Sequence, residues 1–282
     1  QELSQKRAIA AMPIAGSYRS IDFALSNMSN SHIQKVGVCT QYNASSLNTH
    51  LSSSKWWDFG RKQGGLYTFT PTVTANNSWW YRGTADALYQ NISFLKESHE
   101  PYVVIASGDC VYKMDYNKML KAHKQMNADC TIAVIDVPIE EASRFGIMSV
   151  DENNRIFKFA EKPKNPDSTK ASMGIYIFNA KLLCDELRLD AADPESEHDF
   201  GGNIIPKLLN DGRRLYTYKF EGFWRDVGTI SSYLETSMDL LGPEPAFDIY
   251  TNEFPIMSNS STRPPAFYGE NAEVEDCLID NG

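Results

Sequence analysis

Short apolar runs alternate with amphipathic stretches along most of this sequence. Short runs of aliphatic and aromatic residues predict strands at residues 36–40, 102–106, 128–137, 172–179 and 215–220. Apolar residues at helical spacing predict helices at residues 20–29, 44–51, 84–95, 116–126, 180–187, 200–210 and 230–240. Residues 145–150 and 155–159, split by a polar turn, predict a hairpin. This alternation is typical of the α/β class, with a parallel sheet and right-handed crossovers.

The run at 102–106 is followed by Gly108 and Asp109. Four apolar residues in succession predict a strand that is buried on both faces of a parallel sheet. In open α/β sheets, ligands bind at the carboxyl ends of the strands, and a glycine there lets a ligand approach the backbone closely. We therefore interpret Asp109 as holding a metal over a nucleotide. The alternative is that Gly108 and Asp109 only form the turn that ends the strand.

A second carboxylate, Asp226, lies between another predicted strand and the helix at 230–240. Two carboxylates at strand ends suit Mg²⁺, which takes one or two carboxylates together with substrate phosphates. Lys162 and Arg82 can neutralise phosphate oxygens, lysine as a point charge and arginine as a fork. This combination favours phosphoryl or nucleotidyl transfer, in which catalysis is mainly positioning and charge stabilisation.

Residues 52–80 are aromatic and irregular, which is typical of a functional loop. The loop leads through Gly83 to Thr84, which we expect to cap the helix that follows. A phosphate or a base can bind where glycine exposes backbone N–H groups at a helix start. The alternative is an ordinary junction between a loop and a helix.

Composition restricts the class of protein. The 282 residues carry a net charge of −9, which argues against nucleic-acid binding as the main function. No apolar run approaches the roughly 20 residues of a membrane span, so we expect no membrane association, and no signal peptide is visible. The five histidines show no catalytic or zinc pattern, and we expect them on the surface. The five cysteines are scattered, and we expect free buried thiols, as in a reducing cytosol.

Several segments together resemble ADP-glucose pyrophosphorylase, the glucose-1-phosphate adenylyltransferase family. They include Tyr-Arg-Ser-Ile-Asp-Phe-Ala-Leu-Ser-Asn at 18–27, Trp-Tyr-Arg-Gly-Thr-Ala-Asp-Ala at 80–87 and Trp-Arg-Asp-Val-Gly-Thr at 224–229. The others lie at residues 40–42, 108–113, 137–146, 161–163, 172–176 and 198–201. They follow the order of the family over almost the whole chain, and several are specific to it among nucleotidyltransferases.

The resemblance implies a Rossmann-like nucleotidyltransferase domain over residues 1–241, with a mostly parallel mixed sheet. It implies a linker and the beginning of a left-handed β-helix over residues 242–282. Within that stretch Val274 and Ile279 lie near hexapeptide spacing, which is typical of a β-helix repeat. Residue 1 is Gln and a new pattern begins just before Gly282, so we expect this sequence to be a piece of a longer chain.

The resemblance also implies an activity. ATP and glucose 1-phosphate would give ADP-glucose and pyrophosphate, the committed step of bacterial glycogen or plant starch synthesis. The enzyme would use Mg²⁺, would assemble as a homotetramer or heterotetramer, and would be cytoplasmic, or plastidial in a plant. No protein nucleophile is required, because the glucose 1-phosphate oxygen attacks the α-phosphorus in line.

The resemblance implies roles for individual residues. Asp109 and Asp226 would hold the metal, and both would act in catalysis with Lys162. The glucose 1-phosphate site would consist of Glu161 on the sugar hydroxyls, Lys162 on the phosphate, Ser172 and Gly146. The nucleotide would face Tyr81, Arg82, Gly83 and Thr84. Gln41 and the loop with Trp79 and Trp80 would relay allosteric activation to the ATP site.

The sequence departs from the family pattern at three places. The glycine-rich loop, which in the family precedes the segment matching Glu2-Leu3-Ser4, is not in this sequence. Ile9 stands where a lysine would help to neutralise the triphosphate, and Cys110 replaces a histidine. These departures raise a second hypothesis, a catalytically weak regulatory subunit of a heteromeric enzyme. A pyrophosphorylase that uses UTP or dTTP is a third.

Overall fold

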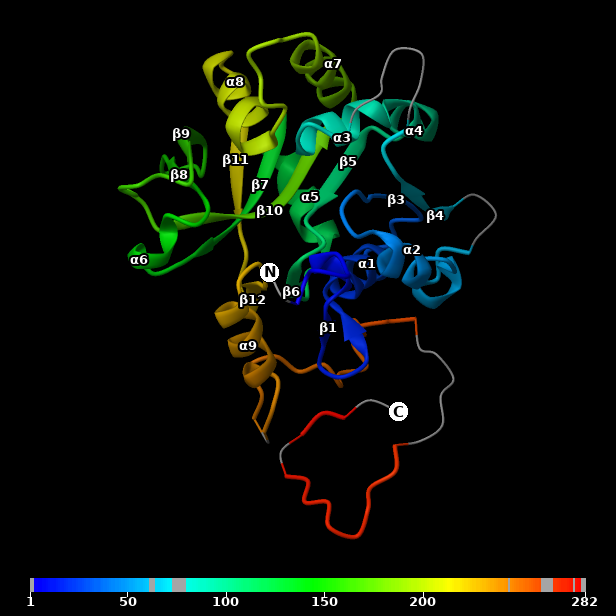
Figure 1. Cartoon of the computed structure of the whole chain (residues 1–282). Helices are drawn as coiled ribbons and strands as arrows, with labels where there is room; N and C mark the ends of the chain where they lie inside the picture. Colours follow the sequence, from blue (N-terminus) through cyan, green and yellow to red (C-terminus); the bar gives the residue numbers. More distant parts are fainter. Residues whose placement is uncertain are drawn as a thin grey trace. The chain divides into compact units, whose positions relative to one another are not determined.

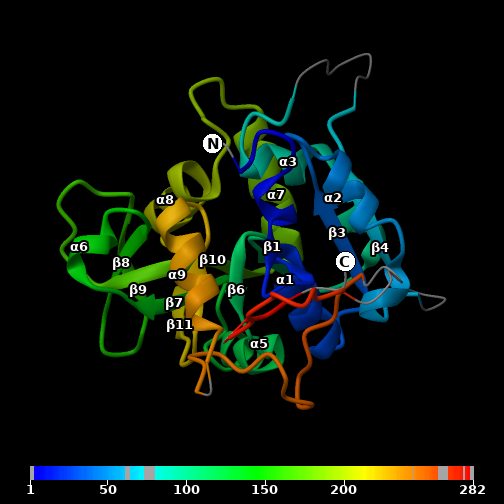
Figure 2. The same cartoon turned by 60° about the horizontal axis from the view of Figure 1, so that its bottom comes forward.

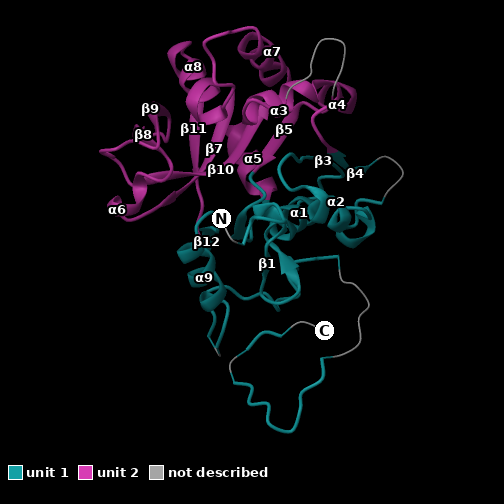
Figure 3. Ribbon diagram, viewed as in Figure 1, with its two compact units in different colours: residues 1–68, 107–115, 222–282 teal, residues 69–106, 116–221 magenta. Residues whose placement is uncertain are grey.

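The computed structural model describes residues 3–60, 64–72, 80–242, 244–259, 266–275 and 277–279 (Figure 1). Two compact units make up the chain (Figure 3). Unit 1 consists of residues 1–68, 107–115 and 222–282, and unit 2 of residues 69–106 and 116–221. Each unit is therefore built from segments that lie far apart in the sequence.

Unit 2 is an α/β unit around one mixed sheet. Its elements, in chain order, are α3 (Thr84–Gln90), α4 (Ile92–Ser98), β5 (Tyr102–Ala106), α5 (Tyr116–Gln125), β7 (Cys130–Asp136), α6 (Ile139–Ala142), β8 (Gly146–Val150), β9 (Ile156–Glu161), β10 (Lys170–Asn179), α7 (Ala180–Ala191), the π-helical turn η3 (Phe200–Ile204), α8 (Ile205–Asn210) and β11 (Leu215–Lys219). The strands follow the order β11-β7-β10-β8-β9, and β5 also pairs with β10. Among the pairings described, β11 with β7 is parallel and the others in this sheet are antiparallel.

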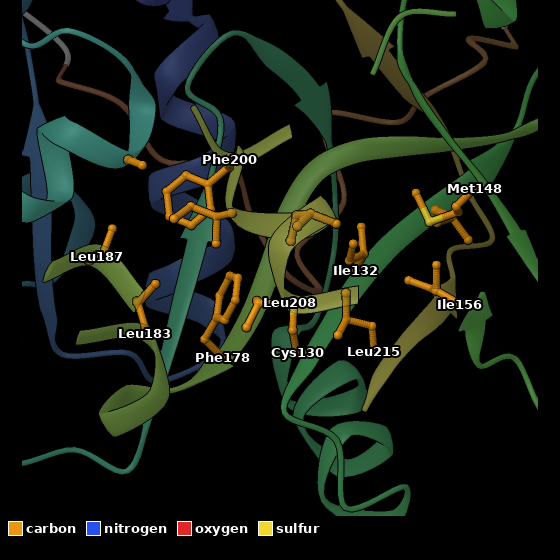
Figure 4. Packing of buried hydrophobic residues seen from close by; sticks show 14 residues of the cluster. Cys130, Ile132, Met148, Ile156, Phe178, Leu183, Leu187, Phe200, Leu208 and Leu215 are labelled. Carbon is orange, nitrogen blue, oxygen red and sulfur yellow. The ribbon is translucent and has the colours of Figure 1, made fainter. Parts of the chain in front are cut away.

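The alternation of side chains along β7 explains how the sheet is covered. Ile132 and Val134 point into one hydrophobic core, which they share with residues of α7, α8 and η3. Figure 4 shows this core, with Leu183 and Leu187 of α7 close to Phe178 and Phe200. Helix α3 packs on α7, and Figures 1 and 2 show the two helices side by side. Thr131 has the opposite orientation and bonds His123 of α5, with 2.8 Å between Oγ1 and Nδ1.

Unit 1 has smaller sheets and two hydrophobic clusters. Its elements are η1 (Ile9–Ala11), β1 (Pro13–Ile14), β2 (Tyr18–Arg19), α1 (Ser20–Asn30), β3 (Lys35–Cys39), α2 (Ser45–His50), η2 (Ser54–Trp57), β4 (Gly65–Phe69), β6 (Cys110–Tyr112), β12 (Trp224–Asp226) and α9 (Ile230–Asp239). The pairs β1-β2, β3-β4 and β6-β12 form two-stranded sheets. Helix α1 contributes Ile21 and Leu25 to one cluster and Phe23 to the other.

Most predicted elements are confirmed, including the α/β class, helix α1 and the β8–β9 hairpin. The hairpin turn forms because the Asp151 carboxylate accepts the backbone N–H groups of Asn153 and Arg155, each at 2.9 Å. The described parts of residues 244–279 contain no helix or strand, so the β-helix stays a prediction. No helix in the described residues has the length and apolar character needed to cross a membrane.

Other expectations are corrected. The helix at 84–95 is two helices, interrupted at Asn91, whose side chain donates to the Ala87 carbonyl at 2.8 Å and to the Tyr81 hydroxyl at 3.1 Å. The strand at 102–106, β5, was expected to be buried on both faces of a parallel sheet. Its described partner, β10, is antiparallel, and the residues of β5 are half-buried. The loop at 52–80 contains η2 and β4.

The expected positions of several polar side chains are also wrong. His50, His123 and His198 are buried, not on the surface. His50 pairs with the buried carboxylate of Asp22 at 2.6 Å. Cys39 and Cys277 are exposed, whereas Cys110, Cys130 and Cys184 are buried free thiols as expected. For His50 the cause is a partner 28 residues away, which a local pattern does not show.

We predict that Asp129→Asn lowers the free energy of unfolding at neutral pH by about 1 kcal/mol, after allowance for solvent screening of Arg214. Asp129 joins the starts of β7 and β11: it accepts from Arg214 N at 2.9 Å, Nε at 3.1 Å and a guanidinium NH₂ at 2.9 Å. These hydrogen bonds hold the pKa of Asp129 below its ordinary value of 3.8.

A lowered pKa stabilises the folded state above the ordinary pKa of 3.8, and this contribution is lost as the pH falls through the lower folded value. The difference between wild type and Asp129→Asn should therefore disappear in acid. Chemical denaturation at a series of pH values measures it. Asp185→Asn, which breaks an exposed pair with Arg188, is the control and should change little. An Asp129→Asn effect that persists in acid would contradict the assignment.

Candidate functional site

Two predicted carboxylates, Asp109 and Asp226, come together in unit 1. Strand β6 pairs antiparallel with β12, and Asp226 stands opposite Cys110. The backbone N–H of Val227 donates to the Asp109 carbonyl at 3.1 Å. The short strand β12 was not predicted, and it is the element that brings Asp226 to Asp109. We call these two residues the carboxylate edge.

Both carboxylates are held by local hydrogen bonds. The Ser107 hydroxyl donates to Asp109 Oδ1, and the Cys110 thiol lies 3.9 Å from the same oxygen. The Gly228 N–H donates to Asp226 Oδ1 at 2.7 Å. The pKa of the Cys110 thiol is raised well above its ordinary value, first by burial and then by the charges of Asp109 and Asp226. The pairing of β6 with β12 and the bond from Val227 to Asp109 are what bring the two carboxylate residues together.

The donor set of the carboxylate edge fits a hard divalent cation. Carboxylate oxygens are the protein ligands that Mg²⁺ prefers, and Mg²⁺ commonly takes one or two of them with water and phosphate. Within the described part of the chain, no three His, Cys, Asp or Glu side chains are grouped so as to hold a metal. The edge therefore fits a cation that shares its ligands with a substrate, and it does not form a closed structural site.

Glu161 is the centre of a second group of predicted residues, in unit 2. The β8–β9 hairpin places it opposite Gly146. A Cβ on Gly146 would lie 2.8 Å from Glu161 Oε2, and a Cβ on Gly201 would lie 2.3 Å from it. The carboxylate thus occupies a space that two glycines leave open, and we call it the glycine cradle. Burial raises the pKa of Glu161, and the Asp199 charge adds to the rise against the opposing effect of Lys162.

Lys162 follows Glu161 in the left-handed region, with φ of 44°. Its N–H donates to the Phe145 carbonyl at 3.1 Å, so the backbone at the end of the hairpin is fixed. Its Nζ lies 3.8 Å from Glu161 Oε1, and its side chain is 67% exposed. An exposed ammonium group on a fixed backbone is suited to a phosphate, which it would attract as a point charge.

Ser172 lies on β10, where the pairing with β7 shifts register between Ser172 and Tyr176. Its hydroxyl accepts the Gly174 N–H at 3.2 Å and also bonds Tyr176. Burial raises the pKa of Tyr176, whose ring stacks on Phe200 at 5.7 Å. Ser172, Glu161 and Gly146 therefore lie on strands of one sheet, and their shared site for glucose 1-phosphate stays a prediction.

The segment 80–84 differs from its prediction. The N-cap of α3 is Gly83, not Thr84. The N–H groups of Ala85 and Asp86 donate to the carbonyl of His198, at 2.8 and 3.4 Å. A Cβ on Gly83 would lie 2.3 Å from that carbonyl oxygen. The glycine therefore permits a close approach of backbone to backbone, and the helix start that we considered for a phosphate is occupied by a protein carbonyl.

Arg82, Tyr81 and Thr84 also have protein partners. The Arg82 guanidinium pairs with Asp86 at 2.8 Å, and the Arg82 N–H donates to the same carboxylate at 3.0 Å. Hydrogen bonds from Arg82 and Gln90 outweigh burial and lower the pKa of Asp86. Tyr81 is 8% exposed. Trp80 is 59% exposed, whereas Trp79 lies outside the described residues.

The Thr84 hydroxyl identifies a residue that the sequence prediction missed. It donates to Asp199 Oδ2 at 2.8 Å and accepts the Phe200 N–H at 3.0 Å. Asp199 Oδ1 accepts the N–H groups of Gly201 and Gly202, each at 2.9 Å, and so caps η3. An Asp before Phe-Gly-Gly is a recognisable cap signal, but the hydrogen bond between Asp199 and Thr84 joins residues that are far apart in the sequence.

Gln41 follows β3 in unit 1 and is half-buried.

Comparison with known proteins shows a consistent relationship. A family model described as Nucleotidyl transferase matches residues 1–242. The chain is 50% identical to the glucose-1-phosphate adenylyltransferase of Clostridium novyi (strain NT) over 280 residues, which are 99% of this chain and 73% of that protein. It is 51% identical to the protein of that name from Clostridium perfringens (strain SM101 / Type A), over 99% of this chain and 72% of that protein. For that of Desulfitobacterium hafniense the identity is 47%, over 96% and 68%.

The glycine cradle predicts a difference between two neighbouring glycines. Gly201→Ala should push the Glu161 carboxylate outward, because the new Cβ would lie 2.3 Å from Oε2. The pKa of Glu161, now raised by burial, should then fall toward its ordinary value of 4.5. Gly202→Ala is the matched control, because its nearest neighbour, Asp199 Cβ, would be 3.7 Å away.

NMR titration of the Glu161 side chain in both variants measures this effect. Neither variant should lose much thermal stability, because the atom displaced by Gly201→Ala is the end of a flexible side chain. The cradle would be refuted by an unchanged Glu161 pKa in Gly201→Ala, or by an equal fall in Gly202→Ala.

Proposed function

The chain belongs to the nucleotidyl transferase family and, within it, to the glucose-1-phosphate adenylyltransferases, and on that premise we propose the reaction it catalyses. The adenylyl group of ATP is transferred to glucose 1-phosphate, giving ADP-glucose and pyrophosphate. The observation that carries this proposal is an identity near 50% to relatives of that name over 99% of the chain. The retained Asp109, Asp226, Glu161 and Lys162 support it.

The glycine cradle and its neighbours would bind glucose 1-phosphate. The Lys162 ammonium group would attract the phosphate, and its exposure leaves it accessible to a ligand. The Glu161 carboxylate would accept hydrogen bonds from sugar hydroxyls. Gly146 would line the sugar site, and its lack of a side chain leaves the room that the Glu161 carboxylate and the Phe159 ring occupy. Ser172 would add a hydroxyl from β10.

The carboxylate edge would hold Mg²⁺ through Asp109 and Asp226. When bound, the ion would stabilise the negative charge that develops on the phosphates as pyrophosphate leaves. The protein contributes two fixed carboxylates: the Ser107 hydroxyl orients Asp109, and the Gly228 N–H orients Asp226. The buried Cys110 thiol lies beside Asp109.

Residues 81–84 would face the nucleotide, as the resemblance implies. The bonds of Arg82 to Asp86 and of Thr84 to Asp199 support a pre-organised backbone there. Gln41 and Trp80 would transmit allosteric activation.

We further propose Mg²⁺ dependence, assembly with family subunits into a tetramer, and a place in glycogen or starch synthesis in the cytoplasm or plastid. Residues 1–241 would be the catalytic domain, and residues 242–282 the linker and the beginning of the β-helix.

The second hypothesis, a catalytically weak regulatory subunit, is not favoured, because the relatives compared carry the name of the enzyme. Ile9, at the position that raised this hypothesis, is 40% exposed in η1. Formation of ADP-glucose by the full-length protein alone, with ATP, glucose 1-phosphate and Mg²⁺, tests the proposal. Activity only after addition of a second subunit would contradict it, and a preference for UTP or dTTP would redirect it.

Asp226→Asn should reduce turnover by at least about 100-fold, the scale of losing a group that stabilises transition-state charge. Its thermal midpoint should change little, because Asn keeps an Oδ1 acceptor for Gly228 and contributes as little to the core. Steady-state kinetics and thermal unfolding measure both quantities. Asp239→Asn, which alters a carboxylate paired with Arg225, is the control and should stay near wild type in turnover. A sharp fall in the thermal midpoint of Asp226→Asn would assign Asp226 a structural role.

The raised pKa of Glu161 predicts a pH dependence. Burial keeps its carboxyl protonated to a higher pH than an ordinary glutamate, with a pKa above 4.5. A protonated carboxyl is a poorer acceptor for sugar hydroxyls, so kcat/KM for glucose 1-phosphate should fall as the pH is lowered through that pKa.

Glu161→Gln should lower kcat/KM at neutral pH and flatten the acid limb of the profile, since its side chain does not titrate. The exposed Glu152→Gln, in the hairpin turn, is the control and should keep the wild-type profile. Profiles of kcat/KM recorded at constant ionic strength measure the effect. An acid limb that is unchanged in Glu161→Gln would show that another group causes it.

A further inference from the structure

Asp190 and His198 form a buried pair in unit 2 that makes none of the contacts assigned above to a substrate. Their side chains are 6% and 4% exposed, and His198 Nδ1 lies 2.8 Å from Asp190 Oδ2. The other carboxylate oxygen accepts the Ser196 hydroxyl at 2.7 Å, and that hydroxyl accepts the His198 N–H at 2.9 Å. A buried polar pair is weak evidence for stability, so its position requires another explanation.

The pair fixes an unusual backbone conformation. His198 has φ of 58°, in the left-handed region that non-glycine residues seldom adopt. Three hydrogen bonds close the segment from residue 190 to residue 198. One joins the His198 imidazole to Asp190, one joins the Ser196 hydroxyl to Asp190, and one joins the His198 N–H to the Ser196 hydroxyl. The conformation directs the His198 carbonyl at the start of α3, where it accepts the N–H groups of Ala85 and Asp86. The imidazole thus anchors the carbonyl that caps this helix.

The same anchor continues to the glycine cradle. Asp199, the next residue, bonds the Thr84 hydroxyl and the N–H groups of Gly201 and Gly202. Gly201 in turn forms one wall of the space that holds the Glu161 carboxylate. A shift of the turn at His198 would therefore move Asp199 and Gly201, and with them the room available to Glu161.

We propose that Asp190 and His198 are positioning residues for the glucose 1-phosphate site, acting through the His198 carbonyl and the Asp199–Gly201 turn. The assignment of the ligand rests on the proposed function. The assignment of the anchor rests on the contacts alone. Residues 82–86 have a second support in the Arg82–Asp86 bonds, so loss of the anchor affects the glucose 1-phosphate side more than the ATP side.

His198→Gly is the informative variant, because glycine keeps the left-handed conformation without strain and removes only the imidazole. Hydrogen exchange of a peptide covering residues 83–88 should become about tenfold faster as the cap loosens. The KM for glucose 1-phosphate should rise about tenfold, whereas kcat and the KM for ATP should change by less than about threefold. Asp190→Ala should give the same result, and the two changes together should cost little more than either alone.

His198→Asn provides a rescue, because Asn tolerates the left-handed region and its Nδ2 can donate where Nδ1 does. It should return the exchange rate and the KM to within about threefold of wild type. Glu195→Ala, in the same turn and exposed, is the matched control and should behave as wild type.

Two results would overturn the proposal: an unchanged exchange rate at residues 83–88 in His198→Gly, or a lowered thermal midpoint with KM for glucose 1-phosphate within about twofold of wild type. The second result would assign the pair a purely structural role. If the wild-type protein forms no ADP-glucose, the proposed function fails instead, and the exchange measurement still decides whether the pair anchors α3.

Discussion

The start of α3 depends on one constraint, that backbone N–H groups removed from water must find an acceptor. The carbonyl of His198 supplies that acceptor for Ala85 and Asp86. It can do so only because residue 83 has no side chain, since a Cβ there would lie 2.3 Å from the carbonyl oxygen. The turn that contains His198 then places Asp199 beside Thr84 and Gly201 beside Glu161. Much of the candidate substrate site in unit 2 therefore follows from this approach of two backbones.

The carboxylate edge of unit 1 depends on strand pairing and not on the capping of a helix. Its two acidic residues are brought together by strand pairing, in which the register of β6 against β12 fixes which residues are neighbours. Each carboxylate is also oriented locally, Asp109 by Ser107 and Asp226 by Gly228. The buried thiol of Cys110 lies behind both charges, and its raised pKa keeps it neutral beside them. The carboxylates of Asp109 and Asp226 therefore have a neutral thiol of strand β6 beside them, and not a third negative charge.

The sequence pattern predicted the elements whose formation depends on residues close to one another in the chain. Helix α1 and the Asp151 turn of the β8–β9 hairpin could be predicted directly, because each depends on residues within one or two turns of the chain. The three-residue strand β12 was missed because it is too short to show a period. The break at Asn91 was missed because its side chain competes for the Ala87 carbonyl, which periodicity does not register. Asp226 and Lys162 were proposed from their positions and chemistry, and Glu161 through resemblance. The bond between Asp199 and Thr84 joins residues 115 positions apart, which no spacing reveals.

Unit 1 is completed by residues that are synthesised late. Strand β6 pairs with β12, and the segment between them, from Lys113 to Phe223, contains most of unit 2. During synthesis the carboxylate edge therefore remains unformed until the ribosome has passed Asp226, although the strands and helices of unit 2 are by then complete. Pairings between residues so distant in sequence form slowly, because the chain must first lose the entropy of a long loop. The order of the chain thus delays the formation of the acidic edge until all of unit 2 has been synthesised.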